Sequence, residues 1–209
     1  MTLAGDCRSH YWKYVDDLTF AENRSSSVTS NLQTDLDDFL KWSVDNQLKL
    51  NPAKCQAMQI CFKTDSPPQP DLKIGPTPLS FVSSAKVLGV WLQTDLKWDG
   101  QVDHMWKNSN RRLFMLRSLK KFGFNTSELV TIYRGYIRPL VEYSDVIWHS
   151  TLTSKQAIKL ENIQKRALRI ILGSNYVSYD NALVVCNLDK LSDRREQHCL
   201  KFAQYIVQV

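Results

Sequence analysis

The chain has 209 residues, of which 43% are hydrophobic, so it is long and apolar enough to bury a core in one large domain or two small ones. This composition excludes a disordered chain. Five cysteines without a C-x-x-C pair favour reduced, buried thiols over a disulfide framework or a zinc finger. No apolar run approaches the roughly 20 residues that span a bilayer, and the first residues lack the pattern of a signal peptide. We therefore expect an intracellular protein, in the cytoplasm or nucleus, with no membrane partner.

The net charge of +6 is distributed unevenly along the chain. Residues 1–99 carry 10 Lys and Arg against 12 Asp and Glu, a balance of −2, whereas residues 100–209 carry 17 against 9, a balance of +8. Basic residues on helical faces attract a polyanion without reading its sequence, so the second half is the candidate for nucleic-acid binding. The alternative is a set of ordinary solvated helix surfaces.

An acidic pair, Asp16-Asp17, follows Tyr14-Val15 between two short segments rich in aromatic and β-branched residues. This pattern predicts a β-hairpin with both carboxylates at its turn. Two adjacent carboxylates repel each other and a divalent cation relieves that repulsion, so the turn is a candidate metal site. The alternative is a plain turn, because Asp is a common turn residue.

The residues that follow predict a helix and a strand. Leucine and valine recur every four residues from Leu32 to Leu48, which indicates an amphipathic helix ending near Asn51-Pro52. Residues 56–62 alternate in the manner of a strand with one apolar face. The order of elements up to this point is ββαβ.

Prolines and further strands complete the first half. Residues 64–78 hold five of the seven prolines, which predicts a loop and excludes a central strand. Residues 79–82 and 86–92 are predicted to form two more strands, with Gly89 allowing a close backbone approach. The fold class of the first half is therefore α+β.

Three or four basic helices are predicted in the second half, from His104 onward. The first ends at Gly123, and Asn125 with Glu128 resembles a capping box that opens the second. Pro139 is expected to kink or end that helix.

The next predicted helix begins near Thr153, where Gln156 would close a second cap. Lys155, Lys159, Arg166 and Arg169 fall on one face of this helix, and the residues roughly opposite are apolar. The opposite apolar positions are Ile163, Ala167, Ile170 and Ile171. A helix with one apolar face and one cationic face can pack its apolar face on a domain and present its cationic face to a nucleic-acid backbone.

Several motifs lie in an order that resembles the carboxyl-terminal part of reverse transcriptases of non-LTR (LINE-type) retrotransposons, most like the jockey and CR1 groups. The matching segments are 12–20 (WKYVDDLTF), 48–55 (LKLNPAKC), 86–92 (KVLGVWL), 136–143 (YIRPLVEY), 148–149 (WH), 163–171 (IQKRALRII) and 191–195 (LSDRR). The resemblance implies a partial polymerase palm in residues 1–99, an antiparallel sheet with a packed helix. It implies an all-helical, basic thumb and post-thumb region in residues 100–209.

The resemblance also implies roles for individual residues. Asp16 and Asp17 would be catalytic ligands of Mg²⁺, with Mn²⁺ as an alternative, and Lys54 would lie near the leaving pyrophosphate. Tyr14 and Val15 would form the floor of the primer and nucleotide site. The expected partners are an RNA template, a DNA primer and deoxynucleoside triphosphates. Leu88, Gly89 and Val90 would form the primer grip, within a hairpin over residues 86–92. Arg111, Arg112, Lys120, Lys155, Lys159, Arg166 and Arg169 would follow the nucleic-acid backbone.

One catalytic feature of the family has no counterpart in the printed sequence. The family has a further catalytic Asp on a separate upstream strand, whereas the one acid upstream of Asp16 here, Asp6, lies in a loop-like context. We therefore expect that this polypeptide does not synthesise DNA by itself, and that it associates with itself through an exposed palm sheet. A non-catalytic nucleic-acid-binding module of the same ancestry is the main alternative, and an unrelated structural domain is another.

Overall fold

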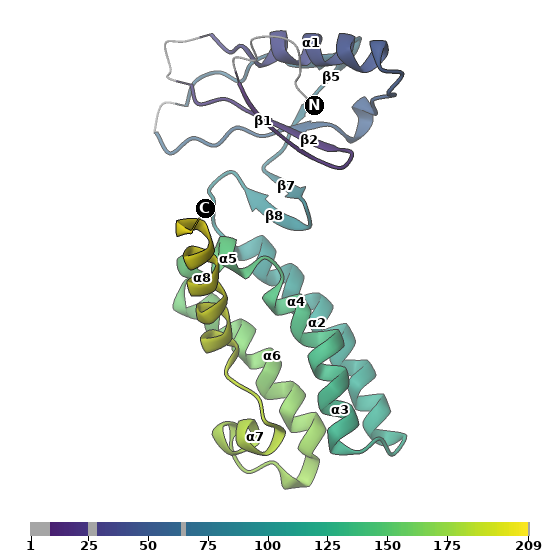
Figure 1. The fold of residues 1–209 in the computed structure, drawn as a ribbon, viewed down its shortest axis with the longest axis vertical. Coiled ribbons are helices and arrows are strands. Elements are labelled where there is room, and N and C mark those ends of the chain that lie inside the picture. The colour runs from purple at the N-terminus through teal and green to yellow at the C-terminus, as the bar shows by residue number, and fades with distance from the viewer. Residues whose placement is uncertain (1–8, 25–28, 64–65, 209) are drawn as a thin grey trace. The chain divides into compact units, whose positions relative to one another are not determined.

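The computed structural model describes residues 9–24, 29–63 and 66–208. The chain divides into two compact units, Met1–Lys97 and Trp98–Val209. Strands and one long helix make up the described part of the first unit, and helices make up the second (Figure 1). This arrangement confirms the predicted α+β class.

The acidic hairpin, formed by β1 (His10–Tyr14) and β2 (Asp17–Ala21), opens the first unit. Its strands pair antiparallel with Tyr14 opposite Asp17, so the loop has two residues, Val15 and Asp16. The hairpin in the predicted position is confirmed. Alternate side chains of a strand point to opposite faces of the hairpin. The inner face of the acidic hairpin packs on helix α1 (Leu32–Asp45).

Aromatic rings join the acidic hairpin to α1. Tyr11 lies across the ladder from Phe20, and the Phe20 ring meets the Phe39 ring edge-on with 5.7 Å between centroids. Phe39 in turn stacks on Trp42. Such pairs prefer these offset and edge-on geometries, so the four rings hold the hairpin on the helix.

Helix α1 differs from its prediction at two places. It ends at Asp45, because Gln47 adopts a left-handed backbone and Leu48 donates its N–H back to the Ser43 carbonyl. Asp35 does not lie at an apolar position of the predicted amphipathic pattern, yet it is buried and accepts hydrogen bonds from the Ser9 backbone N–H and hydroxyl.

The remaining strands of the first unit are short. The described bounds are η1 Pro52–Lys54 (a 3-10 helix), β3 Gln56–Ala57, β4 Lys73–Ile74, β5 Thr77–Pro78, β6 Ser80–Phe81, β7 Ser84–Val87 and β8 Val90–Gln93. They pair two by two as β3–β6, which is parallel, and as the antiparallel pairs β4–β5 and β7–β8. In the described part of the chain the strands thus form four two-stranded ladders, whereas the sequence predicted one antiparallel sheet.

Two predicted strands were wrong in extent. The strand over residues 56–62 stops at Ala57, since its partner β6 offers two residues, and Ile60 and Phe62 are exposed beyond it. Residues 86–92, predicted as one strand from their pattern and as a hairpin from the resemblance, form part of a hairpin, because Leu88 and Gly89 have φ of 46° and 87° and form its two-residue turn. Gly89, with its positive φ, therefore serves the turn.

The second unit is a helical bundle. Its elements are α2 Asp99–Lys121, α3 Thr126–Ile132, the π-helix η2 Tyr133–Ile137, α4 Arg138–Glu142, α5 Asp145–Trp148, η3 His149–Thr151, α6 Ser154–Leu172, η4 Gly173–Asn175, α7 Tyr179–Cys186 and α8 Leu191–Val207. Helices α2 and α6 pack against each other along their length (Figure 1). Leu113, Leu116, Leu160, Ile163 and Ile171 are among the fully buried side chains of the core.

Both predicted capping boxes of the second unit are confirmed. The Asn125 side chain accepts from the Glu128 N–H at 3.0 Å while Glu128 accepts from the Asn125 N–H at 2.8 Å. Thr153 and Gln156 make the same reciprocal pair at the start of α6. Each box satisfies two backbone donors that a helix start leaves without partners.

The first basic helix, α2, starts at Asp99, five residues before the predicted start at His104. Its end agrees with the prediction, because Gly123 has a φ of 90°. Pro139 lies at the second position of α4, and the turn before it is the π-helix η2. Proline removes a helical N–H, so the chain changes its hydrogen-bond pattern there without leaving the helical path.

A buried charged cluster joins three segments that are distant in the sequence. Arg194 of α8 donates two hydrogen bonds, at 2.6 and 3.3 Å, to Glu142 of α4. Arg195 is fully buried, donates from Nε to His149 Nδ1 at 3.3 Å and lies over the Trp148 ring. The motifs around residues 136–143, 148–149 and 191–195 therefore meet in one core.

The four described cysteines are free thiols. Cys186 is buried, as predicted, and burial raises the pKa of its thiol, whereas Cys55, Cys61 and Cys199 are partly exposed. The fifth, Cys7, lies outside the described residues. In the described part of the chain no helix is both long and apolar enough to cross a membrane.

Candidate nucleic-acid interface

A groove lined by five cations lies between the carboxyl-terminal parts of α2 and α6. It has a volume of about 350 Å³ and is open to solvent. The residues that define this cationic groove are Arg117, Lys120, Lys121, Arg166, Arg169 and Ile170. Five positive charges in one depression make a strong local attraction for an anion.

Helical spacing explains why the cations gather there. On α2, Lys120 and Lys121 lie three and four residues after Arg117, which places all three on one side of a helix. On α6, the residues Arg166 and Arg169 are three apart. Since Leu113, Leu116, Ala167 and Leu168 are buried on the facing sides, packing of the two apolar stripes brings the two basic faces to the same groove.

Within the described part of the chain, no acidic side chain neutralises the cations of the groove. Among the described residues, no Asp or Glu oxygen lies within 4.0 Å of any of the five. Arg166 donates to the amide oxygen of Asn110, and the Arg169 guanidinium lies over the Tyr176 ring at 5.4 Å. Both contacts orient the arginines and leave their charge uncompensated.

The other cations predicted to follow the backbone lie outside the groove. Lys155 and Arg111 are exposed. Lys159 pairs with Asp103 and lies 5.3 Å from the Trp106 ring centroid. Arg112 donates to the Tyr136 carbonyl in the π-helical turn and covers the Tyr136 ring at 4.1 Å, so its guanidinium has a role in the fold.

Asp16 and Asp17 lie together at the end of the acidic hairpin. Asp16 is the second residue of the two-residue loop and Asp17 is the first residue of β2, and both side chains are exposed. Val15, the first loop residue, has a φ of 55°, which β-branched residues rarely adopt. In the described part of the chain, no group of three or more His, Cys, Asp or Glu residues is placed to hold a metal ion. Asp6 lies outside the described residues.

The remaining predicted site residues are also in the first unit. Lys54 ends the short 3-10 helix η1 and is exposed. Leu88 and Gly89 form the turn of the β7–β8 hairpin, and Val90 begins β8 and is buried. Tyr14 ends β1 with its ring exposed beside the acidic loop.

Two cations of the groove, Arg117 and Lys121, were absent from the predicted site. Their helix was predicted, but its contact with α6 was not, and that contact decides which faces of the two helices adjoin. Ile170 was predicted on the dry face and instead lines the edge of the groove, whereas Ile163, Ala167 and Ile171 are fully buried as predicted.

No family model, curated protein or solved structure matches this chain.

Proposed function

We propose that this chain is part of a reverse transcriptase of the non-LTR retrotransposon type, and that its helical unit holds the backbone of an RNA template and DNA primer. The observation that carries the proposal is the cationic groove, whose five charges have no acidic partner among the described residues. The order of sequence motifs supplies the polymerase context.

The chemistry of the groove suits a sugar-phosphate backbone. Phosphate oxygens accept charge-assisted hydrogen bonds from guanidinium and ammonium groups, and arginine binds them in a bidentate manner. Cations stand on both walls of the groove, so a strand that lies in it meets donors from α2 and from α6. Contacts of this kind position a nucleic acid and do not read its sequence.

The acidic hairpin supports a role in metal binding. Carboxylate oxygens are the ligands that Mg²⁺ prefers, so Asp16 and Asp17 fit part of its coordination shell. When bound, Mg²⁺ would neutralise the charge of a nucleotide triphosphate. Two metal ions require further shared ligands, so we propose that this polypeptide alone does not extend a primer.

Binding of a fluorescent template–primer duplex tests the proposal. Reversing two charges of the groove with Arg117→Glu and Lys121→Glu should weaken binding by roughly 10-fold to 100-fold, because attraction becomes repulsion. The matched control is Lys41→Glu with Lys201→Glu, which makes the same charge change at two exposed lysines outside the groove. Equal losses in the two double variants would contradict a role for the groove.

Primer extension on an RNA template with Mg²⁺ tests the catalytic part. We expect that the purified 209-residue chain incorporates no nucleotides. Robust incorporation that Asp16→Ala abolishes would overturn that expectation and establish a complete active site.

A non-catalytic binding module is the second candidate. The specific observation in its favour is that α2 and α6, both in the second unit, form the whole groove, so backbone binding requires no residue of the first unit. Affinity for the template–primer that Asp16→Ala leaves unchanged, with and without Mg²⁺, would favour this candidate.

A further inference from the structure

An exposed row of three aromatic rings runs along the outer face of the acidic hairpin. The aromatic row consists of His10, Trp12 and Tyr14, which alternate along β1 and therefore share one face. Trp12 is 59% exposed and Tyr14 is 64% exposed, and the His10 side chain is exposed as well. Three exposed aromatic side chains on one face of a strand form a contiguous patch, and such patches often serve as binding surfaces.

The cross-strand partners of the row are small. His10 lies opposite Ala21, Trp12 opposite Thr19 and Tyr14 opposite Asp17. Large rings on β1 therefore face short side chains on β2, which leaves the ring faces uncovered.

The opposite face of the same strand is used for packing. Tyr11 and Phe20 lie on that inner face and reach α1 through Phe39. The fold of the hairpin thus accounts for the inner rings and not for the outer ones.

The polar edges of the row have no hydrogen-bond partner among residues 9–24, 29–63 and 66–208. Among the described residues, the side chains of His10, Trp12 and Tyr14 make no hydrogen bond, although each carries an N–H, a ring nitrogen or a hydroxyl. A flat ligand with its own hydrogen-bonding edge would use both the ring faces and these groups. Unpaired nucleobases have that chemistry.

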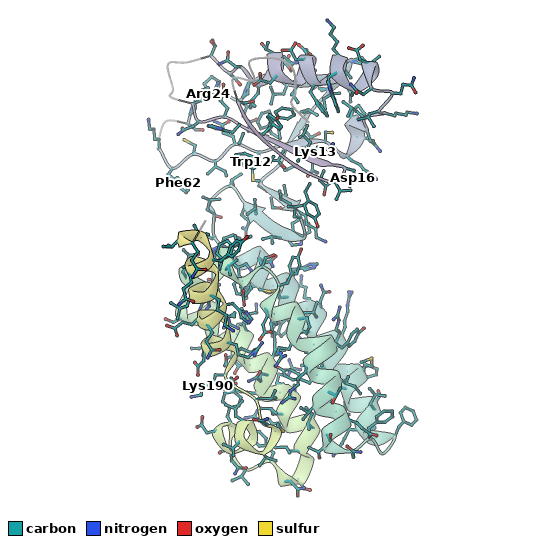
Figure 2. The ribbon with its side chains drawn as sticks, in the orientation of Figure 1. Trp12, Lys13, Asp16, Arg24, Phe62 and Lys190 are labelled. Atoms are coloured by element: carbon teal, nitrogen blue, oxygen red, sulfur yellow. The ribbon has the colours of Figure 1, made fainter. Side chains whose placement is uncertain are left out.

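The spacing of the rings fits a single strand of nucleic acid. Residues two apart on a strand are about 6.7 Å apart, and the centroids of His10 and Trp12 are 6.2 Å apart. This is about twice the 3.4 Å rise of stacked bases, so neighbouring rings can serve neighbouring bases of an extended strand. Lys13 follows Trp12 in the sequence, and its side chain points to the opposite face of the strand. Asp16 lies in the turn at one end of the hairpin (Figure 2), and Asp17 lies opposite Tyr14 at that end of the row.

We propose that the aromatic row is a stacking site for unpaired bases of a single-stranded nucleic acid. The choice of ligand rests on the proposed function, whereas the site itself is separate from the cationic groove. Stacking on aromatic residues tolerates any base sequence, because every base has a π-face.

Two oligonucleotides of equal length separate stacking from backbone binding: one of thymidines and one of abasic sites with the same phosphates. Trp12→Ala should weaken binding of the thymidine strand roughly 5-fold to 100-fold and leave binding of the abasic strand unchanged. Trp12→Phe retains a ring and should restore most of the affinity. The control is Phe62→Ala, which removes a 74% exposed ring elsewhere in the first unit. It should change the affinity for neither the thymidine strand nor the abasic strand.

The contrary outcomes are distinct. If Trp12→Ala binds the thymidine strand as the wild type does, or weakens both strands equally, the stacking site is refuted. If Trp12→Ala instead changes the sedimentation mass of the protein, the row is an interface between copies and the stacking site is again refuted. If the double variant Arg117→Glu with Lys121→Glu binds both strands normally, the proposed function is refuted. The stacking site is then still decided by how Trp12→Ala binds the thymidine and abasic strands.

Discussion

At the scale of single residues, Val15 holds the least favourable backbone of the acidic hairpin. Its φ of 55° is left-handed, and its β-branched side chain is 76% exposed, so no packing compensates locally. Strain of this kind, about 1–3 kcal/mol, often lies at functional loops. Here it lies next to Asp16, a predicted metal ligand.

Replacing Val15 with glycine should stabilise the acidic hairpin. Glycine adopts a positive φ without strain, and this gain exceeds the roughly 0.5–1 kcal/mol that its greater freedom in the unfolded chain removes. Amide hydrogen exchange of β1 and β2 measures the effect, and protection should increase. Val15→Asn should act in the same direction, since Asn tolerates a left-handed backbone. Lower protection in both variants would show that Val15 is not strained.

Protonation of His149 opposes the fold of the helical unit. Burial and the neighbouring Arg195 guanidinium lower its pKa from 6.5, while Asp145 and Glu196 act in the opposite direction. Its Nδ1 accepts from Arg195 Nε, which requires that this nitrogen carry no proton. Because the folded-state pKa is below the unfolded value, the stabilisation is present above about pH 6.5 and is lost as the pH falls through the folded-state pKa.

The helical unit should therefore lose stability as the pH falls below about 6.5, and His149→Asn should reduce that loss. Asparagine can keep an acceptor near the position of Nδ1 and does not titrate. Urea denaturation followed by circular dichroism between pH 5 and pH 7.5 measures the slope. An identical pH slope in wild type and variant would exclude His149 as its source.

At the scale of elements, side-chain caps fix where the helices begin. Asn125 and Thr153 each accept from the N–H three residues later, and each receives a side chain in return. Glu161 caps a helix that is distant in the sequence, because its carboxylate accepts hydrogen bonds from the Leu191 and Ser192 N–H groups at the start of α8.

Asn125→Ala should destabilise the helical unit by about 1 kcal/mol, since it leaves the Glu128 N–H without its acceptor. The denaturation midpoint measures the change. The control is Asn175→Ala, an asparagine of η4 outside any cap. Equal midpoints in the two variants would contradict the capping role.

The sequence predicted well the features that depend on neighbouring residues. Both capping boxes, the turn at Asp16 and the end of α2 at Gly123 follow from local chemistry. It predicted poorly the features that depend on distant partners. The length of the strand at Gln56 is set by the two residues of β6, and the burial of Asp35 is set by Ser9.

The candidate site shows the same division. The basic face of α6 was evident from residue spacing, but the groove exists because α2 contributes a second wall. Which faces of two helices adjoin is decided by packing of their apolar stripes, so Arg117 and Lys121 became part of the site only through tertiary structure.

At the scale of the whole molecule, the candidate binding sites are divided between the two units. The first carries the acidic hairpin with its aromatic row, and the second carries the cationic groove. The net charge of +6 is the sum of −1 for the first unit (10 Lys and Arg against 11 Asp and Glu) and +7 for the second (17 against 10). The second unit therefore accounts for the predicted attraction to nucleic acid.

The salt dependence of duplex binding tests the central claim, that both walls of the groove contact one nucleic-acid backbone. For each phosphate contact removed, the slope of log K against log salt should become shallower by about 0.9. Lys121→Ala on α2 and Arg169→Ala on α6 should each produce about that change, their combination about twice as much, and Lys201→Ala none. An unchanged slope in the double variant would show that the groove does not hold the nucleic acid.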